Sequence, residues 1–497
     1  MKLIKKIAAI MFAFMMVVSM SCNVKADEGT TPTPGETGTI TINNAIPEQT
    51  YTIYKILDLE SYSSKEENGK ETGNFAYKPS SEWESFIKGE NVKDKYFTFE
   101  GEYVSWKENA NPATFAKLAL DYAKQNSSII KTFKVEKAPA ASAEQATTTV
   151  TFSVLDLGYY LVDSSVGTLC SLDTTKPDST IEEKNGVPSV DKKVSSTETG
   201  NYDTSNTASI GDTVYFQTII TAQPGAQNYV LHDKMTDGLT FNNKVEVKKG
   251  ESPVATSYYT LKTSDFNDDC TFEIVFGQTF CDDLQKDEKI TVTYSATLNE
   301  SAVIAGEGNK NETWLKYGEN NNLETTHPTT DTKTFEMHVF KFYIDKNDLT
   351  TEKGLADAKF TLSKNPNGTD PIKLINKGSN TYRVAKKDET NTITEVITPD
   401  NGRFTIQGLG AGTYYLTEIQ QPAGYNKLSG PVTVVIDENE KVRVGESEAN
   451  PVKVENKSGT VLPSTGGAGT TMIYLIGGAL VLGSGVVLVT KRRVKNK

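Results

Sequence analysis

Short stretches in which apolar and polar residues alternate run along most of the chain. Clear examples are Thr39–Ile42, Thr149–Ser153, Thr213–Phe216, Lys289–Tyr294 and Pro431–Ile436. A period of two places every second side chain on the same face of a β-strand. Many short strands separated by turn-forming residues are typical of β-sandwiches, so the pattern predicts an all-β chain of tandem immunoglobulin-like sandwich domains.

One segment in the first third of the chain has a different period. From about Asn111 to Gln125, the residues Phe115, Leu118, Ala119 and Tyr122 recur at helical spacing. We therefore expect a small helical insertion that packs on the first sandwich.

Breaks in the strand pattern divide the chain. A chain of 497 residues is too long for one core. Turn-rich seams occur at Thr174–Ser179 with Gly186–Pro188, and again at Thr325–Thr330. We predict a signal peptide at 1–26, an N-terminal domain at 27–186, a middle domain at 187–331, a C-terminal domain at 332–458 and an anchoring segment at 459–497.

The N-terminus has the three parts of a secretory signal. Basic residues in Met1–Lys6 precede an apolar run from Ile7 to about Met20, and small residues surround Lys25 ahead of a cut after Ala26. Cys22 raises the alternative of a lipoprotein, but the residues before it lack the usual leucine. We therefore expect a secreted chain.

The C-terminus combines an apolar segment with a short motif. Met472–Val489 is long enough to span a bilayer, and basic residues follow it. A plain membrane anchor is the simpler alternative. The motif ahead of the span resembles the LPXTG cell-wall sorting signal: Leu462, Pro463, Ser464, Thr465, Gly466. The resemblance implies that a sortase cleaves after Thr465 and passes its new carboxyl to an amine, so the membrane-spanning precursor is transient.

Composition excludes several classes of function. Hydrophobic residues make up 37% of the chain, charged residues 23%, and the formal net charge is −12. An acidic balance argues against nucleic acid as a partner. The three histidines are scattered, so we expect no metal site, and we expect no cofactor.

No nucleophile elbow or phosphate loop is found, since Gly408–Gly412 is interpreted as a hairpin turn, and we predict that the chain is not an enzyme.

Cysteine contributes little to this chain. After cleavage of the signal peptide, Cys170, Cys270 and Cys281 remain, and an odd number leaves at least one thiol unpaired. Cys270 and Cys281 are close enough in sequence to bridge a hairpin. Buried free thiols are the alternative, and the sequence leaves the choice open.

The body of the chain resembles a known family of surface proteins. Three segments of the C-terminal domain are similar to the collagen-adhesin B-type domains of Gram-positive pilins: Gly354–Leu362, Asn401–Gly408 and Tyr414–Tyr425. The middle domain is similar to the second domain of pilin shaft subunits through Val190–Val194, Val230–Leu239 and Asn309–Tyr317. The order of parts resembles a major (backbone) pilin of sortase-assembled pili.

This resemblance implies a covalent polymer. In the family, the acceptor of the next subunit is a lysine at the end of the first domain, usually within Tyr-Pro-Lys-Asn. Here Lys184 is kept, while Glu182 and Glu183 replace the Tyr-Pro pair. The implied partners are a pilus-class sortase, a housekeeping sortase, other copies of the chain, minor pilins and peptidoglycan, with a host surface ligand left open. The alternative is a monomeric, wall-anchored adhesin that binds host matrix.

The family also forms amide bonds between lysine and asparagine inside its domains. A neutral lysine amine attacks the asparagine side chain beside a protonated acid, and burial favours both neutral forms. Lys346 competes for the lysine of the C-terminal domain, and Lys193 for that of the middle domain. We expect the following lysine, asparagine and acid sets, from the C-terminal domain to the first: Lys341, Asn456 and Glu418; Lys192, Asn311 and Asp233; Lys55, Asn185 and Asp163.

Overall fold

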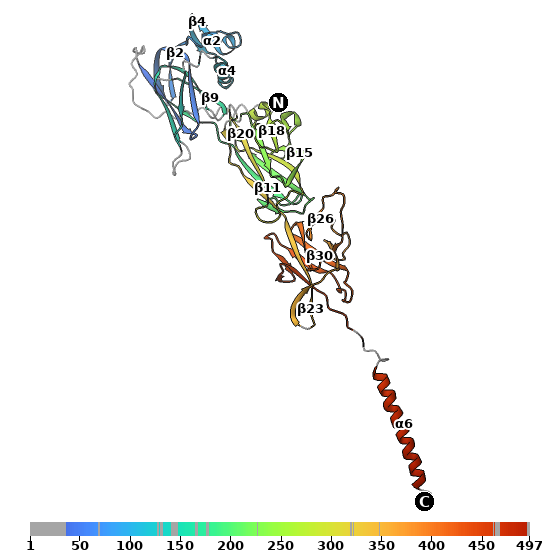
Figure 1. Ribbon diagram of the computed structural model, residues 1–497. Helices are drawn as coiled ribbons and strands as arrows, with labels where there is room; N and C mark the ends of the chain where they lie inside the picture. Colours follow the sequence, from blue (N-terminus) through green and yellow to red (C-terminus); the bar gives the residue numbers. More distant parts are fainter. Residues whose placement is uncertain are drawn as a thin grey trace. The chain divides into compact units, whose positions relative to one another are not determined.

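The computed structural model describes residues 36–494 with short gaps. The gaps are 68–69, 127–128, 130–132, 141–147, 165–166, 175–177, 226, 319–320, 322, 347, 461 and 463–467. The predicted signal peptide lies outside the described residues. The chain forms two compact units, residues 1–334 and residues 335–497. Both consist mainly of β-sheets (Figure 1), which confirms the predicted all-β class.

The first unit begins with two sheets. One has the strand order β10-β1-β7, and the other has the order β4-β5-β3-β2-β8-β9 with β6 also paired to β2. The strands are β1 (Thr37–Ala45), β2 (Thr50–Glu67), β3 (Lys70–Pro79), β4 (Phe97–Glu100), β5 (Tyr103–Trp106), β6 (Phe133–Lys137), β7 (Thr148–Asp156), β8 (Gly158–Ser164), β9 (Gly167–Thr174) and β10 (Asp178–Glu182).

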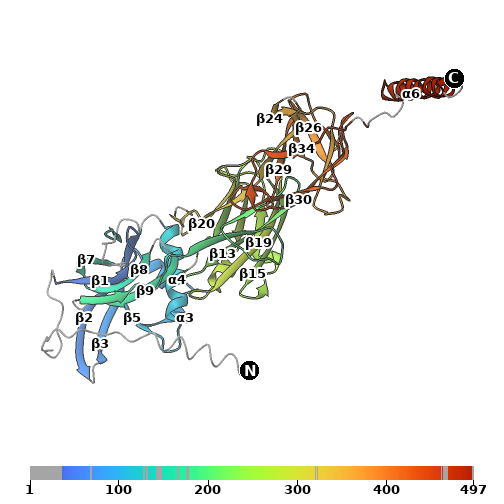
Figure 2. The same ribbon diagram turned by 90° about the horizontal axis from the view of Figure 1, so that it is seen from below.

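The predicted helical insertion is present as α4 (Pro112–Gln125), which lies beside β9 (Figure 2). The side chain of Asn111 accepts a hydrogen bond from the amide of Thr114 and caps the helix. Phe115 and Ala119 are fully buried as expected. Two short helices that the sequence pattern did not predict accompany it: α2 (Glu84–Ile87) and α3 (Lys93–Tyr96).

Two further sheets complete the first unit. Their orders are β11-β13-β19-β15-β16 and β12-β22-β20-β14-β18-β17, with β21 paired to β20. The elements are β11 (Ser189–Ser195), β12 (Ser205–Thr207), β13 (Thr213–Thr221), β14 (Val230–Met235), β15 (Leu239–Lys249), β16 (Ser252–Pro253), η3 (Thr256–Tyr258), β17 (Tyr259–Lys262), β18 (Phe272–Phe276), α5 (Gln278–Asp282), β19 (Lys289–Leu298), β20 (Asn309–Tyr317), β21 (Leu323–Glu324) and β22 (Thr329–Lys333).

The second unit contains two six-stranded sheets. One follows β24-β23-β29-β27-β26 with β34 paired to β23, and the other follows β28-β25-β30-β31-β32-β33. The strands are β23 (Phe335–Asp345), β24 (Asp348–Gly354), β25 (Lys359–Ser363), β26 (Leu374–Gly378), β27 (Thr381–Val384), β28 (Val396–Ile397), β29 (Arg403–Leu409), β30 (Gly412–Gln420), β31 (Val432–Ile436), β32 (Val442–Val444), β33 (Ser447–Glu448) and β34 (Val452–Glu455).

One turn prediction is wrong. The glycine-rich segment Gly408–Gly412 joins β29 to β30, and these strands belong to different sheets. The segment is therefore a connection between the two layers of the sandwich and not a hairpin. Alternation along a single strand cannot show which sheet receives the next strand.

The second unit also includes the long helix α6 (Ala468–Val494). Its segment Met472–Arg492 is long and apolar enough to cross a membrane, with a mean hydropathy of 2.3. This helix matches the apolar segment that the sequence placed after the sorting motif.

The pairing of strands is confined to three stretches of sequence. Described strands pair within Thr37–Glu182, within Ser189–Lys333 and within Phe335–Glu455. The five-part division predicted from the sequence, with boundaries after residues 26, 186, 331 and 458, stays a prediction.

Candidate functional site: two buried lysine clusters

The first cluster lies between the two sheets of residues 189–333. Lys192 on β11 comes from one sheet, and Asp233 on β14 comes from the facing sheet. Asn311 on β20 lies opposite Met235 in the β14–β20 register, so it is a diagonal neighbour of Asp233 on the same face. None of the three exposes more than 1% of its surface. The structure therefore brings together the three residues predicted for the middle domain.

The burial pattern of β11 also shows which of two adjacent lysines belongs to the cluster. Lys192 is buried, whereas Lys193 is only partly buried and lies on the other face of β11. The Lys192 amine lies 2.6 Å from Asp233 Oδ2. It also lies 5.5 Å from the centre of the Phe216 ring and 5.0 Å from that of the Tyr294 ring, and these rings exclude water from it.

Burial acts on both members of this pair in the direction that favours neutral forms. It lowers the pKa of Lys192 and raises the pKa of Asp233, and in each case desolvation is the largest cause. Each group partly offsets the shift of the other through their mutual attraction. Oδ1 of Asp233 and Oδ1 of Asn311 have no hydrogen-bond partner among the described residues. The site thus holds an amine, an acid and an amide whose polar atoms are incompletely paired.

Tyr294 on β19 is a member of this cluster that the sequence analysis missed. Its hydroxyl donates to Asp233 Oδ2, accepts from the Lys192 amine, and lies 3.4 Å from Asn311 Nδ2. The alternation along β19 places Tyr294 on the inward face. That inward position was the available signal, because a buried tyrosine hydroxyl needs a polar partner.

The second cluster lies in the unit formed by residues 335–497. Lys341 on β23 and Glu418 on β30 come from different sheets, and Lys341 Nζ lies 3.3 Å from Glu418 Oε1. Asn456 directly follows β34, which pairs in parallel with β23. Its Nδ2 donates to Glu418 Oε2 at 3.2 Å. Exposure is 0% for Lys341, 2% for Glu418 and 1% for Asn456, so this predicted set is also brought together.

Burial also acts on the lysine of the second cluster. Burial lowers the pKa of Lys341, and the Glu418 carboxylate partly offsets that effect. Among the described residues, Lys341 Nζ and Asn456 Oδ1 lack a hydrogen-bond partner. The competing lysine, Lys346, is exposed.

The set predicted for the first domain is not brought together. In the β2–β8 register Lys55 lies opposite Tyr160, whereas Asp163 lies opposite Thr52, so the two residues occupy opposite faces of the sheet. Asp163 lies 3.6 Å from the Lys124 amine. The prediction of a Lys55–Asp163 pair is therefore wrong, because it assumed a register that the sequence does not reveal.

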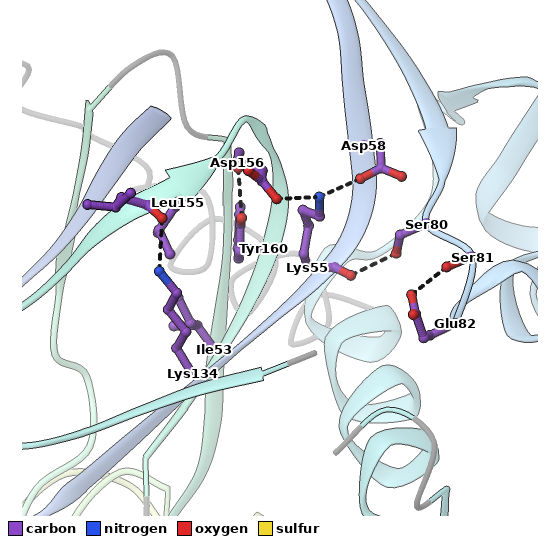
Figure 3. A pocket seen from close by; sticks show the side chains of 11 residues that line it. Ile53, Lys55, Asp58, Ser80, Ser81, Glu82, Lys134, Leu155, Asp156 and Tyr160 are labelled. Atoms are coloured by element: carbon purple, nitrogen blue, oxygen red, sulfur yellow. Dashed lines mark hydrogen bonds and ion pairs between the residues drawn. The ribbon is translucent and has the colours of Figure 1, made fainter. Parts of the chain in front are cut away.

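Lys55 instead lines a cavity of about 360 Å³ in the first unit, together with Asp58 and Asp156 (Figure 3). Its amine lies between two carboxylates, 2.7 Å from Asp58 and 3.4 Å from Asp156. These contacts are ordinary for a partly exposed lysine.

Lys184, the predicted acceptor, is exposed on the segment that follows β10. Glu183 Oε1 accepts hydrogen bonds from the backbone amides of Lys184, at 2.8 Å, and of Asn185, at 2.7 Å. Asn185 is buried, at 7% exposure, and its side chain packs against Gly225. The backbone of the segment is therefore held in place while the Lys184 side chain faces solvent.

The sorting motif is only partly described. Leu462 is exposed, at 82%. Pro463, Ser464, Thr465 and Gly466 lie outside the described residues.

Comparison with protein families identifies two regions. Residues 340–448 match a prealbumin-like fold domain, and residues 454–497 match the LPXTG cell wall anchor motif. The second match and the apolar helix α6 make this chain a cell-wall-anchored surface protein.

Comparison with individual proteins finds relatives among surface proteins. The chain is 24% identical over 255 residues to the trypsin-resistant surface T6 protein of Streptococcus pyogenes serotype M6. The alignment covers 49% of this chain and 44% of that relative, so the chain spans less than half of the relative's length.

Among solved structures, the T6 backbone pilin of serotype M6 Streptococcus pyogenes is 16% identical. It covers 83% of this chain and 81% of its own, with a TM-score of 0.48. The RrgB pilus protein of Streptococcus pneumoniae is 14% identical, covers 87% of this chain and 100% of its own, and has a TM-score of 0.44.

Proposed function

We propose that this cell-wall-anchored protein is the structural shaft subunit of a covalent cell-surface pilus, and that it is not an enzyme. The observation that carries the proposal is the pair of buried lysine clusters in a chain that ends in a wall anchor. Burying a lysine and an acid costs free energy. That cost is understandable if the lysine is consumed in a covalent bond. The wall-anchor motif and the sequence relative described as a surface protein support attachment at the cell surface.

In this proposal the subunits join head to tail. A sortase cleaves between Thr465 and Gly466 and transfers the Thr465 carbonyl to the Lys184 amine of the next copy. The fixed backbone and exposed side chain of Lys184 suit it to enter a sortase active site. The Lys184 amine loses a proton as the amide forms, so a group of the sortase must accept that proton.

The internal bonds form without an external enzyme. The neutral Lys192 amine attacks Cγ of Asn311, and the neutral Lys341 amine attacks Cγ of Asn456. In each case a new N–C bond replaces the C–Nδ2 bond, the amine loses its proton, and ammonia leaves. Asp233 and Glu418 polarise the amide and carry the proton to the leaving group. The first domain, whose lysine and acid lie on opposite faces of a sheet, is not included in this mechanism.

The partners follow from the same mechanism. A pilus-class sortase joins the copies of the chain, and a housekeeping sortase transfers the finished polymer to peptidoglycan. Minor pilins occupy the positions that the shaft subunit does not fill.

Immunoblotting of cell-wall extracts tests the polymer. The intact chain should give a ladder of high-mass species, and Lys184→Ala should reduce it to the monomer. Lys193→Ala is the matched control and should leave the ladder intact. Tryptic mass spectrometry should also detect one peptide in which Thr465 is bonded to Lys184. A ladder that survives Lys184→Ala would rule out that acceptor, and a monomer alone in a strain with an intact pilus sortase would favour the monomeric adhesin.

A further inference from the structure

The strand that carries Asp233 presents a different polar group on its other face. His232 on β14 points away from the lysine cluster, toward the outer face of the sheet. It is nevertheless only 3% exposed. Its ring stacks on Trp314, with centroids 5.1 Å apart, and lies against residues of the segment that connects β17 to β18. A side chain on the outer face of a sheet is ordinarily exposed, so the burial of this imidazole requires a structural explanation.

Four potential metal ligands converge at this histidine. From His232 Nδ1 the distances are 3.2 Å to Cys270 Sγ, 3.2 Å to Asp268 Oδ2 and 3.5 Å to Glu273 Oε1. The ligand atoms of His232, Asp268 and Cys270 all lie within 4.8 Å of one another. The ligands of a tetrahedral zinc ion are roughly 3.3 to 3.6 Å apart, given bond lengths of about 2.0 to 2.3 Å. The spacing around Nδ1 is close to that value.

The positions of these residues are set by the sheet. Glu273 lies directly opposite His232 in the register of β14 with β18, one of the two strands that flank β14. Asp268 and Cys270 lie just before β18, on the segment that passes over the histidine. Residues from two strands and one loop therefore meet at one point, although the sequence analysis expected no metal site because the three histidines are scattered.

We propose that His232, Asp268, Cys270 and Glu273 bind one Zn²⁺ ion. Nitrogen and sulfur ligands are those that zinc accepts and that Ca²⁺ and Mg²⁺ avoid. The site fastens the segment between β17 and β18 onto the outer face of the sheet, behind the strand that supplies Asp233. It is independent of the proposed pilus function.

The charges around the cluster are compatible with a divalent cation. A thiolate and two carboxylates supply three negative charges. The Lys316 amine lies 3.1 Å from Asp268 Oδ2, and the Lys262 amine lies 3.6 Å from Glu273 Oε2. These two lysines and one Zn²⁺ would leave a net charge of +1.

Zinc binds a neutral imidazole and a deprotonated thiol. Binding at Cys270 therefore releases the thiol proton, which the metal's positive charge makes favourable. Among the described residues, Asp268 Oδ1 and His232 Nε2 lack a hydrogen-bond partner, so the existing hydrogen bonds do not satisfy the cluster.

Metal titration of the full chain purified in detergent tests the site. After treatment with a chelator under reducing conditions, the chain should bind one Zn²⁺ per molecule in competition with a chromophoric chelator. Co²⁺ in place of Zn²⁺ should give the intense visible absorption of a tetrahedral site and a thiolate-to-cobalt charge-transfer band. Cys270→Ser should remove that band and weaken Zn²⁺ binding at least about tenfold, since even the loss of a second-shell partner costs about 10- to 100-fold.

Cys281→Ser is the matched control, because Cys281 is a free, buried thiol on α5, away from the cluster in sequence. This variant should keep both the stoichiometry and the cobalt spectrum. Asp268→Asn provides a second test if Cys270→Ser does not fold, and it should also weaken binding. The proposal is overturned if the chain binds no Zn²⁺, if the cobalt spectrum is octahedral, or if binding survives both Cys270→Ser and Asp268→Asn.

Discussion

The amine of Lys192 lies 2.6 Å from a carboxylate oxygen of Asp233, and the two residues reach each other from facing sheets. Neither exposes more than 1% of its surface. A lysine buried in this way is normally a liability, because an ion pair removed from water recovers its solvation only with good geometry. Here the amide of Asn311 also lies beside the pair, which is the arrangement that the proposed lysine–asparagine bond requires.

Replacing Asp233 should stop the proposed reaction of Lys192. In Asp233→Asn no group can carry the proton to the leaving ammonia, so we expect the bond not to form. After correction for the substitution itself, the intact mass of the variant should exceed that of the native chain by one ammonia. The free energy of unfolding should fall by roughly 3–5 kcal/mol, by analogy with a disulfide that closes a loop of similar length. Mass spectrometry and denaturant unfolding measure the two effects. Lys193→Ala should change neither, and a normal mass for Asp233→Asn would show that the acid is dispensable.

The free energy of unfolding of Asp233→Asn should depend on pH in a way that the native chain does not share. In Asp233→Asn the Lys192 amine stays free and buried, and burial lowers its pKa below 10.5. The unfolded chain then binds more protons between the two pKa values, so stability rises as pH increases through that window toward 10.5. The proposed bond consumes this amine in the native chain, so the proposal predicts that the contribution is absent there. Unfolding measured at several alkaline pH values should show the rise in the variant only, and equal slopes would contradict the prediction.

In the C-terminal unit the acid can be altered with little change of shape. Glu418 Oε2 accepts hydrogen bonds from the amide of Leu428 and from Asn456 Nδ2. Glu418→Gln keeps the volume of the side chain but cannot exchange a proton, so we expect no bond between Lys341 and Asn456. Tandem mass spectrometry should find the crosslinked peptide in the native chain and lose it in the variant. Lys346→Ala, which removes the exposed competitor, should retain it.

The acceptor segment should be sensitive to one glycine. Gly225 has φ +78°, and a Cβ atom there would overlap the side-chain oxygen of Asn185. Gly225→Ala should therefore cost about 1–3 kcal/mol and displace the residue that follows Lys184. Unfolding measures the first effect, and the rate of polymer growth on immunoblots measures the second.

The control for this glycine has the same backbone conformation in an open position. Gly250 has φ +58°, and a Cβ atom added there would meet nothing within 4 Å. Gly250→Ala should cost about 1–2 kcal/mol through backbone strain alone and leave polymer growth unchanged. Equal growth rates for the two alanine variants would mean that Asn185 does not position the acceptor.

The resemblance to pilins predicted Lys341 and Lys192 for the buried clusters. Alternation alone left the choice between Lys192 and Lys193 open, because it depends on the register of β11, which the structure supplies. The prediction of the Lys55 set was wrong because it depended on the register between β2 and β8. A single sequence does not reveal which residue of one strand lies opposite which residue of another. Tyr294 was missed because its inward position also fits an ordinary core aromatic, and only the need of its hydroxyl for a polar partner sets it apart.

The cluster at His232 was beyond prediction for a different reason. Cys270 and Asp268 reach it from an irregular segment, and no period constrains where such a segment passes over a sheet. Only Glu273 stands at a regular position, opposite the histidine on the neighbouring strand.

The parallel pairing of β23 with β34 has a mechanical consequence. Lys341 lies opposite Val454, so the entry strand and the exit strand of the C-terminal unit run side by side in the same direction. Tension applied at the two ends of this unit would load their hydrogen bonds together, in shear, and would not open them one at a time. A bond between Lys341 and Asn456 would carry that load directly, and the residues between them would bear no force.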